Sequence, residues 1–301
     1  MGVCEGKVII VTGAARGLGR AHALSLAEQG ARVVVNDLGV ERDGTAATSE
    51  PAQAVVDEII DTGGEAIVNN ADVADWNEAK GMINQAVETW GVLDGLVCNA
   101  GFLRDRMLAS MSEEEWDTVV RVHLKGHFAP ARHAITHWRE RTKNGENVVA
   151  RIVNTSSGAG LMGSIGQGNY AAAKAAIAQL TIQQASEWGR YGVLVNAIAP
   201  DARTRMTEGI FYSSEDVQKG QFDEKAPENV SPLVAWLASP ECDVTGRTFE
   251  ATGGQLNVCD GWQHGPIQSV GQRSMRINEV RDLVHASIEG APPPEEVYGS
   301  Q

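Results

Sequence analysis

The chain has 301 residues, of which 43% are hydrophobic, and a formal net charge of -14 at pH 7. This length and content allow one large globular domain with a sizeable core, whereas the acidic balance argues against nucleic acid and anionic membrane surfaces as partners. No apolar run could span a bilayer, no apolar signal core follows Met1, and the four cysteines have no CxxC spacing, so we expect a cytoplasmic protein in a reducing compartment and no metal site.

Strand-like hydrophobic runs alternate with helical patterns along the chain, which predicts a parallel sheet with helices on both faces. One amphipathic pattern, at 79–90, is closed by Gly91, as is typical of a helix end. Since no break in composition separates the runs, we predict a Rossmann-type, doubly wound α/β sheet of about seven strands in a single domain, with a core over about 7–262. The predicted strands are 7–12, 31–36, 65–71, 93–98, 150–155, 192–198 and 246–252.

Three segments depart from this alternation. Residues 38–51 are polar and predict a surface excursion after the second strand. Residues 203–229 follow the sixth strand, where open α/β sheets bind ligands, so both a substrate lid and an ordinary surface hairpin fit. Residues 263–301 form a C-terminal extension, with a helix predicted over 274–288 and an extended run of prolines at 292–294.

A glycine-rich turn lies between the first predicted strand and the helix after it, with the sequence TGAARGLG at 12–19. Glycines let the backbone approach a pyrophosphate, and the helix N-terminus directs unpaired N–H groups at the anion. The spacing Gly-x-x-x-Gly-x-Gly is wider than the usual dinucleotide fingerprint, and such a motif is weak on its own, but its position between strand and helix fits. The residues expected to hold the cofactor here are Gly13, Arg16, Gly17, Leu18 and Gly19.

Asp37 follows the second predicted strand, about 20 residues past the glycines, where a carboxylate can accept hydrogen bonds from the ribose diol of an adenosine. The same carboxylate repels a 2′-phosphate, which favours NAD over NADP as the cofactor. Arg16 is the opposing observation, because a cation in the turn could hold a 2′-phosphate. The structural alternative for Asp37 is a turn residue.

Tyr170 and Lys174 are separated by four positions in an Ala-rich run that predicts a helix. Residues at i and i+4 share one face of a helix, so a phenol and an ammonium lie side by side. We expect the cation to lower the pKa of the phenol and to make Tyr170 a general acid/base for an alcohol oxygen. The pair alone is common by chance.

Together with several further segments, these motifs resemble those of the short-chain dehydrogenase/reductase family. The resemblance covers residues 7 to about 260, and its motifs are jointly specific. It implies a Rossmann-type fold and an oxidoreductase that uses a nicotinamide cofactor. The matching segments are TGAARGLG at 12–19, Asp72-Val73, Asn99-Ala100-Gly101, Ser157, Tyr170-x-x-x-Lys174 and NAIAP at 196–200.

By this resemblance, Tyr170 is the catalytic acid/base, and Lys174 lowers its pKa and also hydrogen-bonds the nicotinamide ribose. Ser157 donates a hydrogen bond to the substrate oxygen. Ser156 is the neighbouring candidate, but the family spacing to the tyrosine favours Ser157.

Further cofactor contacts follow from the same resemblance. They are implied for Asp72 and Val73 at the adenine, for Asn99, Ala100 and Gly101 along the cleft, and for Pro200 and Thr204 near the nicotinamide carboxamide. Asp201 stands where many family members have glycine, which leaves the geometry of that loop open.

His123 stands where many members of the family carry an asparagine that completes a proton relay. Its helical stripe is apolar, so the imidazole is expected to face inward. Two functions remain open for it, a catalytic proton relay and a hydrogen-bonded core residue. The pairs His123/His127 and His133/His137 have metal-ligand spacing, but no adjacent glutamate supports a metal.

Within the family, segments such as NAGFLRDRM at 99–107 and RVHLKGHF at 121–128 resemble the (3R)-hydroxyacyl-CoA dehydrogenase part of the peroxisomal multifunctional enzyme and its stand-alone bacterial relatives. The resemblance implies NAD-dependent oxidation of a 3-hydroxyacyl-CoA-type alcohol. The alternatives are a steroid or other bulky secondary alcohol, an NADPH-linked 3-oxoacyl reductase, and a non-catalytic cofactor-binding scaffold. The family's pairing of helices, here 116–138 and 170–188, implies a homodimer or homotetramer.

Overall fold

The structure is a computed structural model that describes residues 2–39, 48–203, 221–259 and 261–299. One sheet of eight strands forms its centre, in the order β3-β2-β1-β4-β5-β6-β7-β8. The strands β1 to β7 are parallel and β8 runs antiparallel to β7. Their bounds are β1 Val8–Thr12, β2 Arg32–Asn36, β3 Glu65–Asn69, β4 Gly95–Cys98, β5 Ala150–Thr155, β6 Val193–Pro200, β7 Thr248–Thr252 and β8 Gln255–Cys259.

The predicted α/β class and the seven parallel strands are confirmed. The eighth strand, β8, was not predicted. β7 and β8 form a hairpin whose turn consists of Gly253 and Gly254, with Thr252 paired to Gln255. Gly253 has a φ of +51°, a conformation that glycine adopts without strain. Two glycines between strand-like runs are a known hairpin signal, and that signal was present in the sequence.

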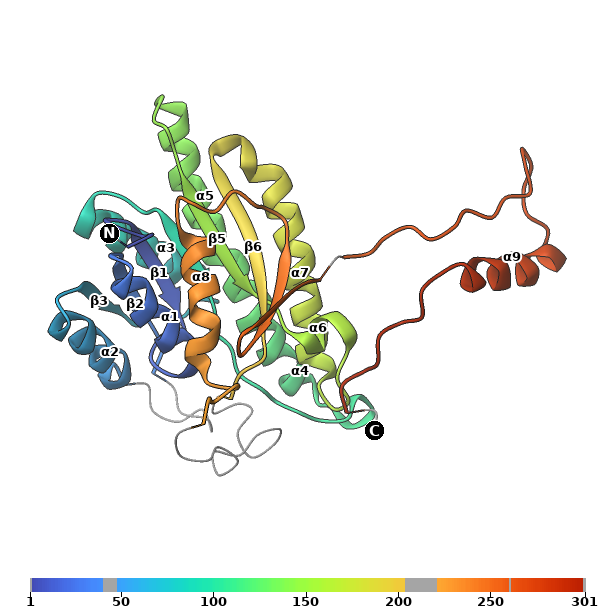
Figure 1. Cartoon of the computed structure of the whole chain (residues 1–301), viewed down its shortest axis with the longest axis horizontal. Coiled ribbons are helices and arrows are strands. Elements are labelled where there is room, and N and C mark those ends of the chain that lie inside the picture. Colours follow the sequence, from blue (N-terminus) through green and yellow to red (C-terminus); the bar gives the residue numbers. More distant parts are fainter. Residues whose placement is uncertain (1, 40–47, 204–220, 260, 300–301) are drawn as a thin grey trace.

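Helices cover both faces of the sheet (Figure 1). On one face pack α1 (Gly17–Glu28), α2 (Glu50–Asp61) and α8 (Ser231–Ala238), and their apolar side chains share a core with the strands. On the other face pack α3 (Trp76–Trp90), α5 (Gly126–Lys143) and α7 (Gly168–Trp188), around a second core. Trp138 of that core is fully buried and its indole N–H donates to the Leu93 carbonyl at 2.7 Å.

Shorter elements surround the carboxyl ends of the strands. They are the helices α4 (Glu113–Val120) and α6 (Gly158–Met162), a π-helix at Arg121–Lys125, and 3-10 helices at Leu108–Ser110 and Pro227–Val230; a further 3-10 helix, Gly189–Tyr191, precedes β6 at the opposite edge of the sheet. Because all parallel strands end at the same edge of the sheet, the segments after β1, β2, β4, β5 and β6 meet there. The expected closing glycine is also observed, since Gly91 ends α3 with a φ of 78°.

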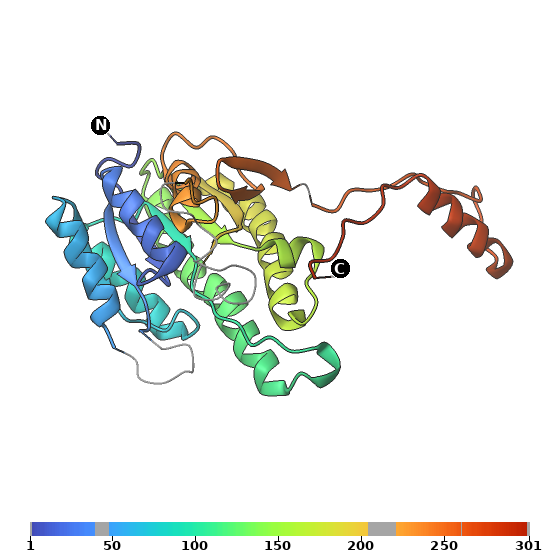
Figure 2. The same cartoon turned by 60° about the horizontal axis from the view of Figure 1, so that its bottom comes forward.

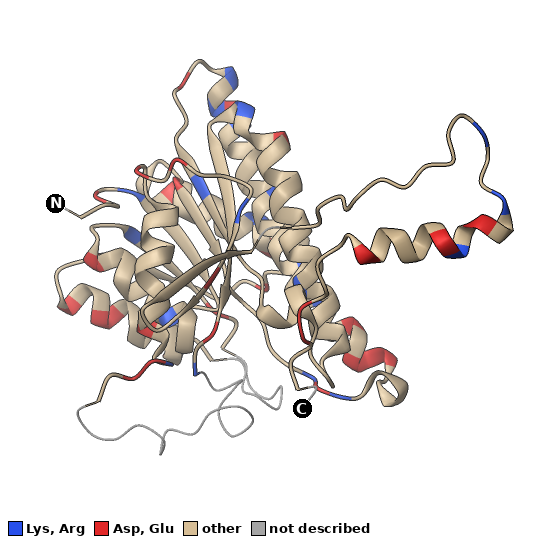
Figure 3. Ribbon diagram, turned by 45° about the vertical axis from the view of Figure 1, so that its right-hand side comes forward, with Lys and Arg blue, Asp and Glu red and all other residues tan. Residues whose placement is uncertain are grey.

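The C-terminal arm, residues 261–299, leaves the body after β8 and projects from it in both views (Figures 1 and 2). It contains α9 (Ile277–Glu289), which confirms the predicted helix, and no residue of α9 is buried. Acidic residues occur on α9 as well as on helices of the body (Figure 3). The arm returns at Tyr298, which forms a β-bridge with Ser164.

Candidate active site

Tyr170 and Lys174 lie on α7, as predicted, and face the carboxyl end of β5. The Lys174 ammonium is 5.5 Å from the centre of the Tyr170 ring, and its Nζ donates a hydrogen bond to the Thr155 carbonyl at 2.6 Å. Lys174 is 2% exposed, whereas Tyr170 is half-buried. The ammonium is therefore fixed to the end of the strand, and the phenol retains an accessible side.

Burial controls the ionisation of this pair. It lowers the pKa of Lys174 to about 7, because the protein removes water from the ammonium. Burial also raises the pKa of Tyr170, although a hydrogen bond with Ser157 partly opposes the rise. The expected lowering of the phenol's pKa by Lys174 is thus not observed. Desolvation disfavours the charged forms of both groups, and Lys174 itself is less basic than a free lysine.

Ser157 follows β5 and caps the N-terminus of α6, where its Oγ accepts a hydrogen bond from the Ala159 N–H at 3.2 Å. Its hydroxyl also forms the hydrogen bond with Tyr170 that shifts the phenol's pKa. The neighbouring candidate, Ser156, is fully buried and donates to the Lys174 carbonyl at 2.8 Å. Ser156 therefore joins β5 to α7, and Ser157 is the serine that reaches the phenol.

His123 is 1% exposed on the π-helix, and its ring meets the Tyr170 ring edge to face at 5.1 Å. Its Nε2 lies 2.8 Å from the Phe102 carbonyl and 3.1 Å from the Phe102 N–H. Within the described residues, Nδ1 has no hydrogen-bond partner. Burial holds the pKa of His123 well below 6.5, so the imidazole is neutral. The inward orientation is confirmed, and a role in proton relay stays a prediction.

Gly101 makes room for this imidazole. A Cβ at Gly101 would lie 2.1 Å from the His123 Cε1, a separation that real side chains do not allow. The predicted glycine of the Asn-Ala-Gly motif therefore packs against His123, in addition to lying beside the predicted cofactor cleft.

His127 is a buried contact that the sequence reading considered only as a metal ligand. Its Nδ1 lies 2.7 Å from the His123 carbonyl, and its Nε2 accepts from the Thr155 N–H at 3.3 Å. Burial lowers the pKa of His127 to about 3, so the ring is a neutral hydrogen-bonding bridge between the π-helix and β5. No group of three or more potential metal ligands gathers anywhere in the described part of the chain.

The glycine-rich turn has the tight backbone that a pyrophosphate requires. Gly13 has a φ of +65°, and a Cβ there would lie 2.7 Å from the Ala100 Cα. At Gly19 a Cβ would lie 2.0 Å from the Gly13 carbonyl oxygen. Gly17 has a φ of 53° and begins α1. These glycines allow β1, the turn and α1 to pack closely against one another and against the chain after β4, which is the packing that a dinucleotide-binding turn requires.

Hydrogen bonds of Thr12 and Asn99 stabilise the glycine-rich turn. The Thr12 hydroxyl accepts hydrogen bonds from the N–H groups of Asn99 and Ala100, at 2.9 and 3.1 Å. The Asn99 amide in turn donates to the carbonyls of Thr12 and Gly13, at 3.1 and 3.2 Å. Thr12 belongs to the quoted motif, but its function as a link between β1 and β4 was not foreseen.

Asp37 lies at the end of β2, against the glycine-rich turn. Its carboxylate accepts hydrogen bonds from the Ala15 N–H at 3.0 Å and from the Gly39 N–H at 2.8 Å. Each oxygen keeps a lone pair for a further donor, so the carboxylate is held where a ribose diol could reach it. The hydrogen bond from the Ala15 N–H places Asp37, the predicted ribose contact, directly beside the glycine-rich turn, which is the predicted phosphate site.

The structure gives less direct support for the predicted contacts of Asp72 and Val73 with the adenine. The Asp72 carboxylate pairs with Arg121 at 2.7 Å and accepts from the Ala74 N–H at 2.8 Å. Val73 is 5% exposed and packs against Gly126, where an added Cβ would lie 2.7 Å from the Val73 Cγ2. Both side chains therefore serve to fasten the chain after β3 to the π-helix and α5, and cofactor contact by these residues remains a prediction.

One cavity of about 540 Å³ brings the predicted catalytic and nicotinamide-end residues together. Thr204, predicted at the carboxamide, lies outside the described residues, as do positions 205–220 of the predicted lid. The predicted residues that line the cavity are Leu18, Asn99, Gly101, His123, Ser157, Tyr170, Lys174 and Pro200.

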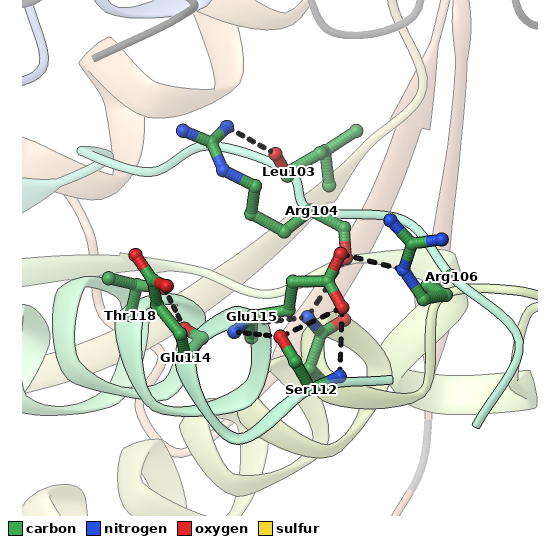
Figure 4. Close-up of polar contacts among 8 residues, drawn as sticks. Leu103, Arg104, Arg106, Ser112, Glu114, Glu115 and Thr118 are labelled. Carbon is green, nitrogen blue, oxygen red and sulfur yellow. Dashed lines mark hydrogen bonds and ion pairs between the residues drawn. The ribbon is translucent and has the colours of Figure 1, made fainter. Parts of the chain in front are cut away.

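The loop after β4 lies beside this cavity. Polar contacts with α4 hold the loop in place (Figure 4). Glu115 pairs with Arg106 at 2.7 Å, and Ser112 and Glu115 cap α4 reciprocally. Asn169, fully buried and next to Tyr170, donates to the carbonyls of Arg104 and Glu115, at 3.0 and 2.8 Å. The start of the catalytic helix is therefore fastened to α4.

Comparison with known proteins agrees with this arrangement. A family model described as short chain dehydrogenase matches residues 7–213. A crystal structure of a short chain dehydrogenase from Mycobacterium avium superimposes with a TM-score of 0.89 at 57% identity, and the match covers 99% of this chain and 100% of that one. This chain therefore belongs to the short-chain dehydrogenase/reductase family.

Two curated relatives narrow the similarity further. The hydroxyacyl-CoA dehydrogenase ChsB1 of Mycobacterium tuberculosis is 48% identical over 261 residues, which cover 84% of this chain and 80% of the relative. The peroxisomal multifunctional enzyme type 2 of Mus musculus is 41% identical over 280 residues, which cover 92% of this chain and 36% of that enzyme. The predicted resemblance to this subgroup is thus confirmed. No helix in the described residues is long and apolar enough to cross a membrane.

Proposed function

We propose that this protein is an NAD-dependent dehydrogenase that interconverts a secondary alcohol and a ketone on a 3-hydroxyacyl-CoA-type substrate. The observation that carries the proposal is that one cavity is lined by Ser157, Tyr170 and Lys174 together with the predicted cofactor-binding residues Asn99 and Pro200. A hydroxyacyl-CoA dehydrogenase among the relatives supports this substrate class.

Hydride transfer is the chemistry that a bound nicotinamide cofactor supplies. The chain's own residues manage the substrate oxygen. The Ser157 hydroxyl donates a hydrogen bond to that oxygen, and the Tyr170 Oη removes its proton in oxidation or returns it in reduction. Lys174, anchored at the Thr155 carbonyl, holds a positive charge beside the phenol when protonated and so stabilises the phenolate that forms.

Cofactor choice follows from the end of β2. The Asp37 carboxylate is fixed by the Ala15 and Gly39 N–H groups, so it cannot turn away from a ligand there without losing both bonds. A 2′-phosphate beside it would face a negative charge. This supports NAD.

The experiment that tests the function measures NADH formation with purified protein across a panel of alcohols. The panel holds (3R)- and (3S)-hydroxyacyl-CoA thioesters and steroid alcohols, each with NAD and with NADP, and 3-oxoacyl thioesters with NADH and with NADPH. We expect the highest kcat/KM for a hydroxyacyl-CoA with NAD. A steroid preferred by tenfold or more would favour the bulky-alcohol alternative, preference for NADPH with 3-oxoacyl thioesters would favour the reductase, and no turnover with any substrate would favour a non-catalytic scaffold.

We also propose that the protein is a homodimer or a homotetramer. A groove of about 680 Å³ is lined by residues of α4, the π-helix, α5 and α7, among them the apolar side chains of Val120, Leu124, Phe128 and Leu180. A second copy related by a two-fold axis would cover both grooves with the same patch. Ala172 and Ala175 of α7 are exposed, as that arrangement needs, but Ile177 is fully buried in its own chain and does not face outward.

The assembly is tested with Ala176→Arg, which adds a large cation beside the exposed alanines of α7. We expect dissociation in light scattering and a loss of activity, because the catalytic helix loses its support. A wild-type protein that is fully active as a monomer at micromolar concentration would contradict the assembly.

A further inference from the structure

The end of the C-terminal arm is built into the rim of the catalytic cavity. The Ile165 N–H donates to the Tyr298 carbonyl at 3.0 Å, and the Tyr298 N–H donates to the Gly163 carbonyl at 3.1 Å. Gly163 has a φ of +91°, and Val297 packs 3.4 Å from the place where its Cβ would be. These contacts attach the arm to the segment between α6 and α7. Ser157 precedes α6 and Tyr170 lies in the first turn of α7.

The Tyr298 side chain lies next to the catalytic serine. A Cβ on Gly158, the residue after Ser157, would come within 2.7 Å of the Tyr298 hydroxyl and 2.8 Å of its Cε2. Gly158 therefore leaves the space that the phenol ring occupies. Tyr298 lines the same cavity as Ser157 and Tyr170, yet it is 47% exposed, so one side of the ring remains open to a ligand.

Glu250 of β7 faces the Tyr298 hydroxyl. The hydroxyl donates to the Glu250 Oε1 at 3.4 Å, a long bond of modest strength. In the described part of the chain, this hydroxyl is the one hydrogen-bond donor to the Glu250 carboxylate. Burial and the nearby charges of Glu250 and Asp201 raise the pKa of Tyr298, so the phenol stays neutral and keeps its proton.

The surroundings of Glu250 are polar. Asn257 of β8 is its register partner, and Gln255 and Asn257 line the cavity with it. Asp201, also in the lining, is paired with Lys225 at 2.5 Å, so that cation is already engaged. A carboxylate with free lone pairs accepts N–H or O–H groups and repels phosphates.

We propose that Tyr298 and Glu250 form a substrate-recognition site, in which the Tyr298 ring limits the size of the group carried by the reacting carbon and the Glu250 carboxylate accepts a hydrogen bond from a neutral N–H or O–H donor of the substrate. This inference rests on the proposed function. It places the phosphates of a CoA substrate away from β7 and β8, because Glu250 would repel them.

The site is tested with three substitutions and one matched control. Tyr298→Ala removes the ring, Tyr298→Phe removes only the hydroxyl, and Glu250→Gln keeps the shape of the side chain but removes its charge. The control is Glu296→Gln, the same chemical change two residues before Tyr298 on an exposed part of the arm. Circular dichroism and NAD affinity establish that each variant is folded.

Two sets of substrates separate the ring from the carboxylate. Hydroxyacyl pantetheine thioesters with slim and bulky acyl groups test the ring, and we expect Tyr298→Ala to shift the kcat/KM ratio toward the bulky group by on the order of tenfold, while Tyr298→Phe leaves that ratio unchanged. Cyclic alcohols with and without a second hydroxyl are compared with pantetheine thioesters and their amide-free analogues. This comparison distinguishes an O–H donor from the amide N–H of a pantetheine arm.

We expect Glu250→Gln to raise KM roughly fivefold for substrates with a donor, and to leave both kcat and the donor-free substrates unchanged. Titration calorimetry of the corresponding ketones gives the same comparison without turnover, so the recognition site is tested even if the proposed reaction fails. Equal affinities and equal substrate ratios in all four variants would overturn the proposal.

Discussion

The catalytic helix α7 and the end of the C-terminal arm both contribute to the lining of one cavity and are held in different ways. Lys174 is buried on α7 and is held through the Thr155 carbonyl and the Ser156 hydroxyl. α9, in the middle of the arm, has no buried residue. Among the described residues of the arm, Tyr298 lines the cavity and Val297 packs against Gly163. Chemistry that depends on proton transfer thus sits on a rigid element, and selection of the substrate falls partly on a segment that few contacts hold.

The two regions differ in how their polar groups find hydrogen-bond partners. Around α7, polar groups that are removed from water need partners inside the protein. Lys174 finds one at the Thr155 carbonyl and Asn169 at the carbonyls of Arg104 and Glu115, whereas the His123 Nδ1 has none in the described residues. Each such bond restricts the catalytic side chains. Along the described arm as far as the end of α9, the side-chain hydrogen bonds are local, as between Arg273 and Glu279, and no residue of α9 is buried against the body. We therefore expect substitutions near α7 to change turnover or stability and substitutions in the arm to change substrate preference.

The largest expected effect is that of Tyr170→Phe, which removes the proton-transferring hydroxyl and leaves the ring beside His123. Turnover should fall by at least about 100-fold, the usual scale for the loss of a general acid or base, while NAD affinity and the fold stay nearly intact. Steady-state kinetics and cofactor titration measure both. The control is Tyr191→Phe, at the far end of α7, and comparable turnover in Tyr170→Phe would reject the assignment of the acid/base.

The sequence was sufficient for the groups that local patterns fix. The helix spacing placed Tyr170 beside Lys174, and the glycine spacing identified the turn after β1. It did not give the direction of the Tyr170 pKa shift, because that direction depends on burial by elements far away in the chain. It also did not reveal Tyr298 in the cavity, since no local pattern at a chain end specifies a contact with Gly158.

The next largest effect is a loss of stability in acid, centred on His22. This histidine is fully buried, joins α1 to α8 through a contact of 2.9 Å between its Nδ1 and the Ser231 hydroxyl, and has a pKa lowered from 6.5 to about 3 by burial. As the pH falls below 6.5, the unfolded chain takes up a proton that the folded chain excludes, so stability is complete above 6.5 and is lost progressively down to about 3. At pH 5 the loss is about 2 kcal/mol for this residue.

Denaturant unfolding between pH 7 and 5 measures this loss. His22→Gln should remove the share of His22 from the dependence of the unfolding free energy on pH, even if the variant is less stable at pH 7. His123 and His127, whose pKa values burial also lowers, keep their share of that dependence. The matched change in the arm is His285→Gln, on the exposed α9, which should leave the dependence as it is. An equal slope in His22→Gln and the wild type would show that His22 is protonated in the folded protein.

A third effect concerns the cofactor. We expect NAD to bind more tightly than NADP by about 1–2 kcal/mol, because a 2′-phosphate would lie beside the Asp37 carboxylate. Asp37→Ala should narrow that gap, and Tyr298→Ala should leave it unchanged, since the arm reaches only the substrate end of the cavity. Isothermal titration with both cofactors measures the difference. Equal affinities in the wild type would mean that Arg16 outweighs Asp37.

The smallest effect is expected in the arm itself. Ile277 begins α9 and is 89% exposed, so Ile277→Ala removes no buried contact of the chain and should change the unfolding free energy by less than about 0.5 kcal/mol. The contrasting change, Trp138→Ala, empties a fully buried position and should cost about 3–5 kcal/mol. The comparison is made at several protein concentrations. A loss of unfolding free energy in Ile277→Ala that grows as the protein is concentrated would mean that α9 packs against another copy of the chain. The arm would then be held in place by the assembly.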